Sequence, residues 1–401
     1  MKRVLFVDDE AAILDGLRAR LHRATEWEMV FALGADKALQ ELERHPFDVV
    51  VTDVRMPHMD GRELLQAVSS RWPETVRMVL SGYSEQQQAM NLVPFAHQFV
   101  TKPCESQQLR NRIERALQLH DFLRKPELRA AVGRVRSLPA MPRTYALLKT
   151  AMANEGSCVA DIAKIVAADT VIAAKVLQMV NSAFFRLARR ITNIEQAVGY
   201  LGFATVRNLV LSVEVFSQWS NAPSLVIELE KLQLHVQRVT TAAAALTAGT
   251  PIVDDTLLAA LLHDIGYWVL IQEFPREFQL ARQMSAAEGI ALRVAETKII
   301  GASHSEIGAY LLGLWGLPYS VVEAVAHHSE PQRVQHEEFD ALTGLAMAHS
   351  LVDLSEAKVF GLPEEVETDL QREQLQQLPA PFGWLEAQRR VSEALSSGET
   401  Q

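Results

Sequence analysis

Residues 49–57 read VVVTDVRMP, a short apolar strand that ends in the acidic residue Asp53 and a turn. Amphipathic helical patterns separate this strand from similar apolar runs, as expected for a parallel β-sheet covered on both faces. These runs lie at Val4–Val7, Met29–Ala32, Val76–Leu80 and Phe99–Thr101. The pattern over residues 1–121 therefore predicts a doubly wound α/β domain with a five-stranded parallel sheet and five helices.

Polar residues follow four of the five runs: Asp8, Asp9, Asp53, Ser81 and Lys102. In open α/β sheets, ligand-binding groups gather at the carboxyl ends of the strands. The acidic pair suits Mg²⁺, which prefers carboxylate and water oxygens, and Asp53 belongs to the carboxylate class of covalent acceptors. Lys102 supplies a cation, and Ser81 a hydroxyl, for phosphoryl oxygens. The pattern predicts a magnesium-dependent site that accepts a phosphoryl group on Asp53.

Over about residues 1–121 the sequence resembles the receiver domain of two-component response regulators. The matching motifs are VDDE at 7–10, TDVRMP at 52–57, LSG at 80–82 and VTKP at 100–103. The resemblance implies that the main-chain carbonyl of Arg55 joins Asp8, Asp9 and Asp53 around Mg²⁺. It also implies that phosphorylation draws Ser81 toward the phosphate and lets Phe99 turn inward, so that these two residues act as the switch.

The strand signal disappears after the receiver-like segment. The fifth helical pattern runs past the sheet, so we expect residues 122–127 to be a linker that continues this helix until Pro126 ends or bends it. Apolar residues at three- and four-residue spacing then predict an all-helical domain at 128–335. We expect residues 336–401 to form a helical extension whose end is frayed.

A second set of polar residues lies in or beside the predicted helices of this domain: His235, His263, Asp264, His304, His327 and His328. An adjacent His-Asp pair with further histidines on neighbouring helices can bind divalent transition metal ions. A metal-bound hydroxide could then attack a phosphodiester. The spacing resembles that of the HD superfamily of metal-dependent phosphohydrolases, whose signature matches HDIG at 263–266.

Three features depart from the catalytic pattern of the HD-GYP branch, which degrades cyclic di-GMP. Tyr267 stands where that branch has a lysine, and an aromatic ring cannot replace a cation against a phosphate. No Gly-Tyr-Pro motif follows His328. The late acidic ligand of the superfamily falls on His349. The metal ligands are therefore retained better than the residues that handle phosphate.

The segment before the histidines resembles the HDOD domain, an HD-related output domain generally regarded as lacking hydrolase activity. The matching pieces include LPAMP at 138–142, VNSAFF at 180–185 and AVGYLG at 197–202. One departure is Thr170, which stands where a proline commonly follows the aspartate. The resemblance covers about residues 128–330 and implies output through protein contacts.

Composition agrees with a soluble, cytoplasmic protein. The net charge of −10 and the lack of a long basic run do not favour nucleic-acid binding. Two cysteines give no disulfide framework, and no apolar stretch reaches the ~18 residues needed to span a bilayer. We expect no membrane insertion.

The sequence thus predicts a response regulator without enzymatic activity, with a sensor histidine kinase as phosphodonor. Phosphorylation of Asp53 alters the receiver surface and the interactions of the HDOD domain with downstream signalling proteins. A homodimer through the receiver is a candidate assembly. The alternative is a receiver-controlled metal-dependent HD phosphodiesterase or phosphohydrolase that acts on a cyclic dinucleotide or nucleotide.

Overall fold

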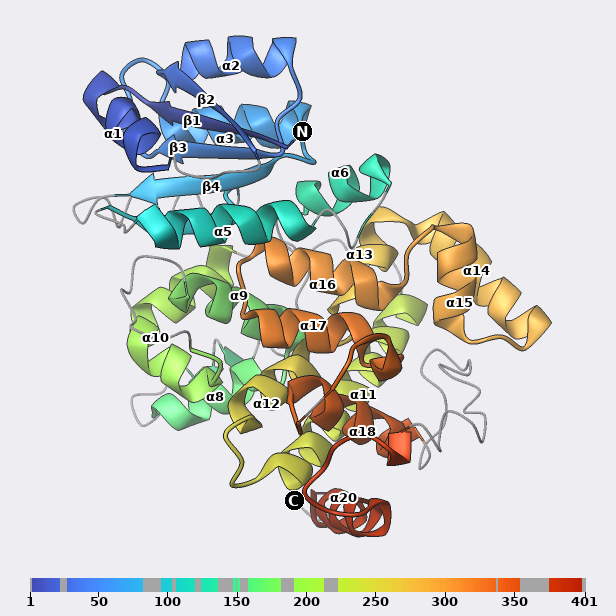
Figure 1. Ribbon diagram of the computed structural model, residues 1–401. Helices are drawn as coiled ribbons and strands as arrows, with labels where there is room; N and C mark the ends of the chain where they lie inside the picture. Colours follow the sequence, from blue (N-terminus) through green and yellow to red (C-terminus); the bar gives the residue numbers. More distant parts are fainter. Residues whose placement is uncertain are drawn as a thin grey trace. The chain divides into compact units, whose positions relative to one another are not determined.

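The computed structural model describes residues 2–21, 27–81, 95–102, 106–119, 123, 125–135, 147–148, 150–151, 158–181, 191–212, 223–336, 338–353 and 375–398. The chain divides into two compact units. The first consists mostly of Met1–Ser137 and the second mostly of residues 138–401, and each is described by itself (Figure 1).

The first unit is built around a five-stranded parallel sheet in the order β2-β1-β3-β4-β5. Its strands are β1 (Arg3–Asp8), β2 (Glu28–Leu33), β3 (Val49–Asp53), β4 (Val76–Ser81) and β5 (Gln98–Thr101). The central strand β3 is buried along its whole length, as expected when helices cover both faces of a sheet. The parallel α/β fold predicted from the sequence is confirmed.

Helices cover the two faces of this sheet. They are α1 (Ala11–Leu21), α2 (Ala35–Arg44), α3 (Gly61–Arg71) and α5 (Ser106–Gln118). Contacts pair α1 with α5 and α2 with α3, as in a doubly wound sheet. The helix predicted between the fourth and fifth strands lies outside the described residues.

The segment after α5 differs from the expected continuous helix. Helix α5 ends at Gln118, and Leu123 is not helical. A separate helix, α6 (Pro126–Arg134), begins with its proline in the first turn. Proline is favoured at this position because the N–H it lacks has no partner within the helix there. Pro126 therefore starts a helix instead of ending one.

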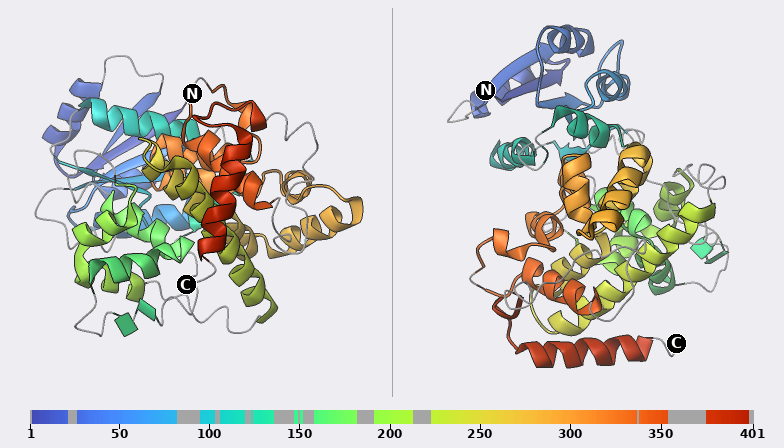
Figure 2. Two further views of the ribbon diagram at one scale, coloured as in Figure 1. Left: turned by 90° about the horizontal axis from the view of Figure 1, so that it is seen from below. Right: turned by 90° about the vertical axis from the view of Figure 1, so that its right-hand side faces the viewer.

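The second unit is helical throughout its described part. Its helices are α8 (Val159–Ala167), α9 (Thr170–Val180), α10 (Ile194–Ser212), α11 (Pro223–Thr247), α12 (Val253–Leu262), α13 (Ile265–Glu273), α14 (Pro275–Glu288), α15 (Leu292–Ile299), α16 (His304–Leu314), α17 (Tyr319–His327), α18 (Ala341–Asp353) and α20 (Trp384–Gly398), with a 3-10 turn at Pro331–Arg333. Helices α11, α12 and α18 contact one another, and α17 contacts α12 and α18. Helix α20 packs against α11 and α18 (Figure 2).

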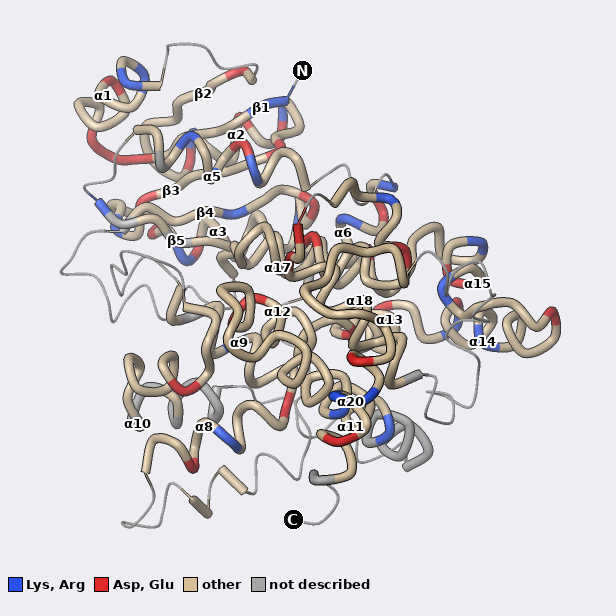
Figure 3. The backbone as a smooth tube through the Cα atoms, turned by 60° about the horizontal axis from the view of Figure 1, so that its bottom comes forward, with Lys and Arg blue, Asp and Glu red and all other residues tan. Residues whose placement is uncertain are grey.

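Helix α13 is almost wholly apolar and buried, with Glu273 as its one charged residue. Charged residues of both signs are interspersed along α14 and α15 (Figure 3). Among the described helices, none is by itself long and apolar enough to cross a membrane. One sharply bent pair, Val253–Glu273 with Pro275–Glu288, meets the criteria of length and composition when its members are taken together.

Candidate functional site

Two carboxylates and an ammonium group meet at the carboxyl edge of the sheet. The Lys102 Nζ donates to Asp8 Oδ2 at 2.8 Å and to Asp53 Oδ1 at 2.5 Å. Asp8 ends β1, Asp53 ends β3, and Lys102 follows β5, so parallel strands bring residues 94 and 49 positions apart into contact. Asp8 and Asp53 are buried, whereas the lysine side chain is 26% exposed. The arrangement holds a cation against a reachable carboxylate.

The surroundings of Asp53 fix its carboxylate. Its Oδ2 accepts a hydrogen bond from the main-chain N–H of Arg55 at 3.1 Å. Gly61, the first residue of α3, approaches so closely that a Cβ there would overlap the Asp53 carbonyl oxygen. Burial lowers the pKa of Lys102, but its hydrogen bonds to Asp53 and Asp8 outweigh burial and hold the pKa above its ordinary value. Lys102 is therefore a permanent cation at neutral pH.

The other residues predicted for this site lie at or beside strands β1, β4 and β5. Asp9 is exposed directly after β1, and Asp8 Oδ1 accepts the main-chain N–H of Glu10 at 3.0 Å. Ser81 and Phe99 occupy β4 and β5, but their side chains lie outside the described part of the chain. The buried carboxylates of Asp8 and Asp53, beside the exposed carboxylate of Asp9, provide the oxygen donors that suit Mg²⁺.

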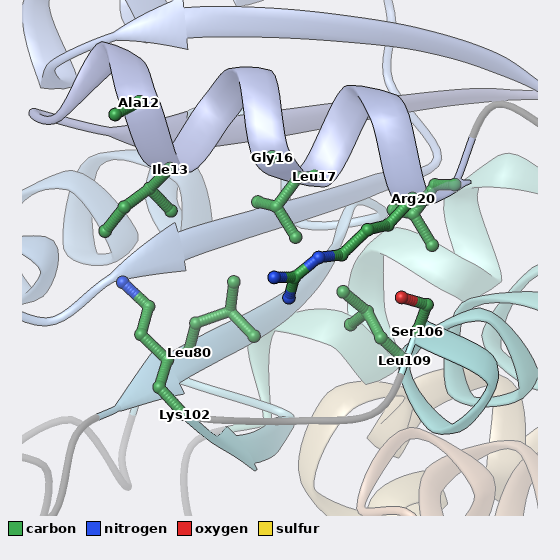
Figure 4. A pocket seen from close by; sticks show the side chains of 10 residues that line it. Ala12, Ile13, Gly16, Leu17, Arg20, Leu80, Lys102, Ser106 and Leu109 are labelled. Atoms are coloured by element: carbon green, nitrogen blue, oxygen red, sulfur yellow. The ribbon is translucent and has the colours of Figure 1, made fainter.

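A largely apolar pocket of about 320 Å³ opens between α1 and α5, beside Lys102. Figure 4 shows Ile13 and Leu17 of α1 facing Leu109 of α5, with Arg20 reaching in from the end of α1. Leu80 and Lys102 complete one side of this pocket, which therefore adjoins the carboxyl edge of the sheet.

A second cluster of polar side chains lies inside the helical domain. The donor atoms of His235, His263 and His349 lie within 4.8 Å of one another, and so do those of His263, Asp264 and His328. All of these residues are buried. They come from α11, the α12–α13 junction, the end of α17 and α18. We call these five residues the histidine cluster.

Local hydrogen bonds orient two of the cluster imidazoles. The Nδ1 atom of His263 lies 2.7 Å from the Ala260 carbonyl oxygen, and that of His328 lies 2.9 Å from the Val325 carbonyl oxygen. Because a carbonyl can only accept, each Nδ1 carries a proton, and each Nε2 lies on the opposite side of its ring within the cluster. Neither of these Nε2 atoms has a hydrogen-bond donor among the described residues.

The Nε2 atoms of three histidines lie near the Asp264 carboxylate. His263 Nε2 lies 3.1 Å from Asp264 Oδ2, and neither carboxylate oxygen meets hydrogen-bond geometry with any described residue. Burial raises the pKa of Asp264, but the nearby His263, His235 and His304 outweigh burial and hold it far below its ordinary value. Burial, with His349 and His263 beside it, lowers the pKa of His328 well below its usual range. The arrangement therefore offers imidazole nitrogens and one carboxylate that could hold a metal ion.

His304 adjoins the cluster and is held by two neighbours. Its main-chain N–H and its Nδ1 each lie 2.8 Å from Oε2 of Glu296, a wholly buried carboxylate on α15. Its Nε2 lies 3.8 Å from Asp264 Oδ1. Tyr267 stacks on the His304 ring with the centroids 4.0 Å apart. A carboxylate on Nδ1 is the usual partner of a metal-binding imidazole.

Of the five histidines that the sequence nominated in this domain, the donor groups include His235, His263 and His328, while His304 only adjoins them. His327 is half-buried and belongs to neither donor group, because adjacent residues on a helix point about 100° apart. His349 takes part, whereas the sequence marked it only as a departure from an acidic ligand. Glu296 was not foreseen, since it lies outside every motif and its eight-residue separation from His304 carries no pattern.

Comparisons with known proteins identify two domain families in the chain. The family of response regulator receiver domains matches residues 4–114, and the HDOD domain family matches residues 138–331. An uncharacterized protein of Treponema pallidum is 25% identical over 224 residues, which cover 55% of this chain and 43% of that protein. The response regulator protein PilR of Pseudomonas aeruginosa is 33% identical over 147 residues, which cover 36% of this chain and 32% of PilR.

A solved structure, the MmoQ response regulator of Methylococcus capsulatus, is 18% identical, with a TM-score of 0.47. The match covers 65% of this chain and 98% of that structure. The chain spans less than half the length of the two curated relatives named above. The two family matches follow one another along the chain. The chain therefore belongs to the response regulators, with a receiver domain at residues 4–114 and an HDOD domain at residues 138–331.

Proposed function

We propose that this response regulator accepts a phosphoryl group on Asp53 and reports it through protein contacts of its HDOD domain. The contact of Lys102 with both Asp8 and Asp53 is the observation that carries the proposal. An Asp53 carboxylate oxygen forms the new bond to phosphorus while the bond between phosphorus and the leaving group breaks. Lys102 then neutralises charge on the phosphoryl oxygens.

Mg²⁺ supplies further charge neutralisation when it is bound by Asp8, Asp9, Asp53 and the Arg55 carbonyl. Ser81 and Phe99 serve as the switch in this proposal. A sensor histidine kinase is the phosphodonor, and the protein acts in the cytoplasm, where downstream signalling proteins bind the HDOD domain. A homodimer through the receiver is part of the same hypothesis.

We expect phosphorylation to change which proteins the full-length chain binds. The experiment is a pull-down on immobilised protein, with and without an acyl phosphate and Mg²⁺, from extract of the source cells. Partners that respond to phosphodonor should be lost or gained with native protein and should not respond with Asp53→Ala. Identical captures for native protein and variant under both conditions would contradict the proposed output.

The histidine cluster favours a second role, the binding of one divalent transition metal ion. Buried imidazole nitrogens beside one carboxylate suit ions such as Zn²⁺, Fe²⁺ or Ni²⁺ better than Mg²⁺. His235, His263, Asp264, His328 and His349 would hold the ion, with His304 beside them. A bound ion of this kind supplies Lewis acidity, which is the basis of the phosphohydrolase alternative.

The alternative activity receives less support from the residues around the cluster. The ring of Tyr267 covers one face of His304, and the motif position at Tyr267 offers no cation for a substrate phosphate. We therefore expect no turnover of cyclic dinucleotides or nucleotides with added Mn²⁺ or Fe²⁺. Turnover that disappears in Asp264→Ala would establish the hydrolase instead.

We expect protein purified without chelator to carry a transition metal, measured by inductively coupled plasma mass spectrometry. His328→Ala should lose it, because His328 belongs to the cluster, whereas the adjacent control His327→Ala should retain it. Metal at about 100 times its Kd should also stabilise native protein by about 2.7 kcal/mol. The site would be contradicted if both variants lost the metal equally, or if native protein carried no metal.

A further inference from the structure

Arg77, the second residue of β4, carries a buried charge at the amino end of this strand, whereas Asp53 lies at the carboxyl end of β3. Arg77 is 2% exposed, which is rare for arginine unless its donors are satisfied. Its guanidinium donates to the carbonyl oxygens of Pro73 at 3.2 Å, Thr75 at 3.1 Å, Phe95 at 2.6 Å and Gly133 at 2.6 Å. One side chain thereby joins the loop before β4, the segment before β5 and the last turn of α6.

Helix α6 packs so closely beside this arginine that its last turn has no room for a larger residue at Gly133. A Cβ at Gly133 would overlap the Pro73 carbonyl oxygen, so the two backbones touch directly. Leu128 and Val132 of the same helix are buried. A cation at the carboxyl end of a helix also interacts favourably with the helix dipole. Arg77 therefore sets where α6 ends, and the chain continues from there to the HDOD match at residue 138.

The same arginine holds the amino end of β5. His97, the residue before β5, pairs with Arg77 twice: its Nδ1 accepts the main-chain N–H of Arg77 at 3.2 Å, and its main-chain N–H donates to the Arg77 carbonyl oxygen at 2.8 Å. At the other end of this four-residue strand, Lys102 contacts Asp53 and Asp8. Strand β5 lies at the edge of the sheet and pairs with β4 alone. An edge strand held by one neighbour is the strand that can shift with least loss of hydrogen bonds.

We propose that Arg77 is the positioning residue that couples phosphorylation to output, by tying α6 to β5. This inference rests on the proposed phosphorylation of Asp53. Lys102 leaves its present contact with Asp53 Oδ1 when that oxygen is bonded to phosphorus, and β5 carries the displacement to His97 and Phe95. Because the guanidinium bonds the Phe95 and Gly133 carbonyl oxygens at once, α6 must adjust. The two arrangements of this packed node are the bistable element that phosphorylation biases.

The test is hydrogen–deuterium exchange of the α6 amides in full-length protein, with and without an acyl phosphate and Mg²⁺. In native protein, phosphorylation should change the exchange of α6. Arg77→Lys keeps the charge but loses the fork that reaches several carbonyls. In this variant α6 should exchange about tenfold faster, equivalent to about 1.4 kcal/mol, and should no longer respond to phosphodonor. Gly133→Ala, which displaces α6 and leaves Arg77 intact, should have the same effect.

Arg71→Lys is the matched control, because Arg71 is a half-exposed residue of α3 that pairs with Glu43. It should exchange and respond as native protein does. Labelling of Asp53 should persist in Arg77→Lys and in Gly133→Ala, so failure of the coupling is distinguishable from failure of the phosphorylation site. The proposal is wrong if α6 of labelled native protein shows no change, or if both variants respond as native protein does.

Discussion

Asp53→Ala should take up no phosphoryl label from an acyl phosphate in the presence of Mg²⁺, whereas native protein should be labelled. The reason is that the Asp53 carboxylate contacts Lys102 and is also held by the Arg55 N–H. Labelling is measured as a mass increase of the intact chain or by electrophoresis that retards phosphoproteins. The expected magnitude is loss to background.

Asp36→Ala is the control for this experiment, because Asp36 is an exposed acidic residue in the first turn of α2. It removes the same chemical group and should leave labelling unchanged. In Asp53→Ala, Lys102 keeps its partner Asp8, so the circular dichroism spectrum should match that of native protein. Label uptake by Asp53→Ala at the native rate would show that another residue is the acceptor.

The largest effect on stability is expected for Gly266→Ala. A Cβ at Gly266 would overlap the main-chain carbonyl oxygen of His304 and lie 3.0 Å from the Gly308 nitrogen. Helices α13 and α16 therefore touch through their backbones, which cannot rotate out of the way. Overpacking of this kind costs typically 1–3 kcal/mol, and we expect the upper end, about 3 kcal/mol. That cost lowers Tm by about 6–12 °C in a domain of this size.

Calorimetry of the full-length chain measures this change. The control is Gly199→Ala in α10, where the nearest atom, Val159 Cγ1, would lie 3.9 Å away. That change should be neutral or stabilising, since alanine is the better helix former. If Gly266→Ala has the same Tm as Gly199→Ala, the close approach of α13 and α16 does not determine stability.

Gly266 shows how much a sequence motif reveals about the packing of a residue. The sequence placed Gly266 in an HDIG signature without a physical reason for the glycine. The structure supplies it: two helices cross at a distance that excludes any side chain at this position. Such a contact depends on the path of α16, which begins 38 residues later in the chain, so local spacing could not predict it.

The receiver site was the easier prediction for a structural reason. All strands of a parallel sheet end at one edge, so a residue placed after a strand is already placed near the other strand ends. The meeting of Asp8, Asp53 and Lys102 follows from the strand pattern alone. The switch roles of Ser81 and Phe99, the Arg55 carbonyl ligand and the domain boundaries stay predictions.

By itself the sequence determined the two-part organisation of the chain and the meeting of Asp8, Asp53 and Lys102 at the strand ends, because both follow from short-range periodicity. Tertiary structure alone decided the histidine cluster, in which His349 enters and His327 is turned away. It also decided the docking of α6 on Arg77. The direction of a helical side chain depends on how the whole helix is rotated and packed, and that rotation is set by contacts between residues far apart in the sequence.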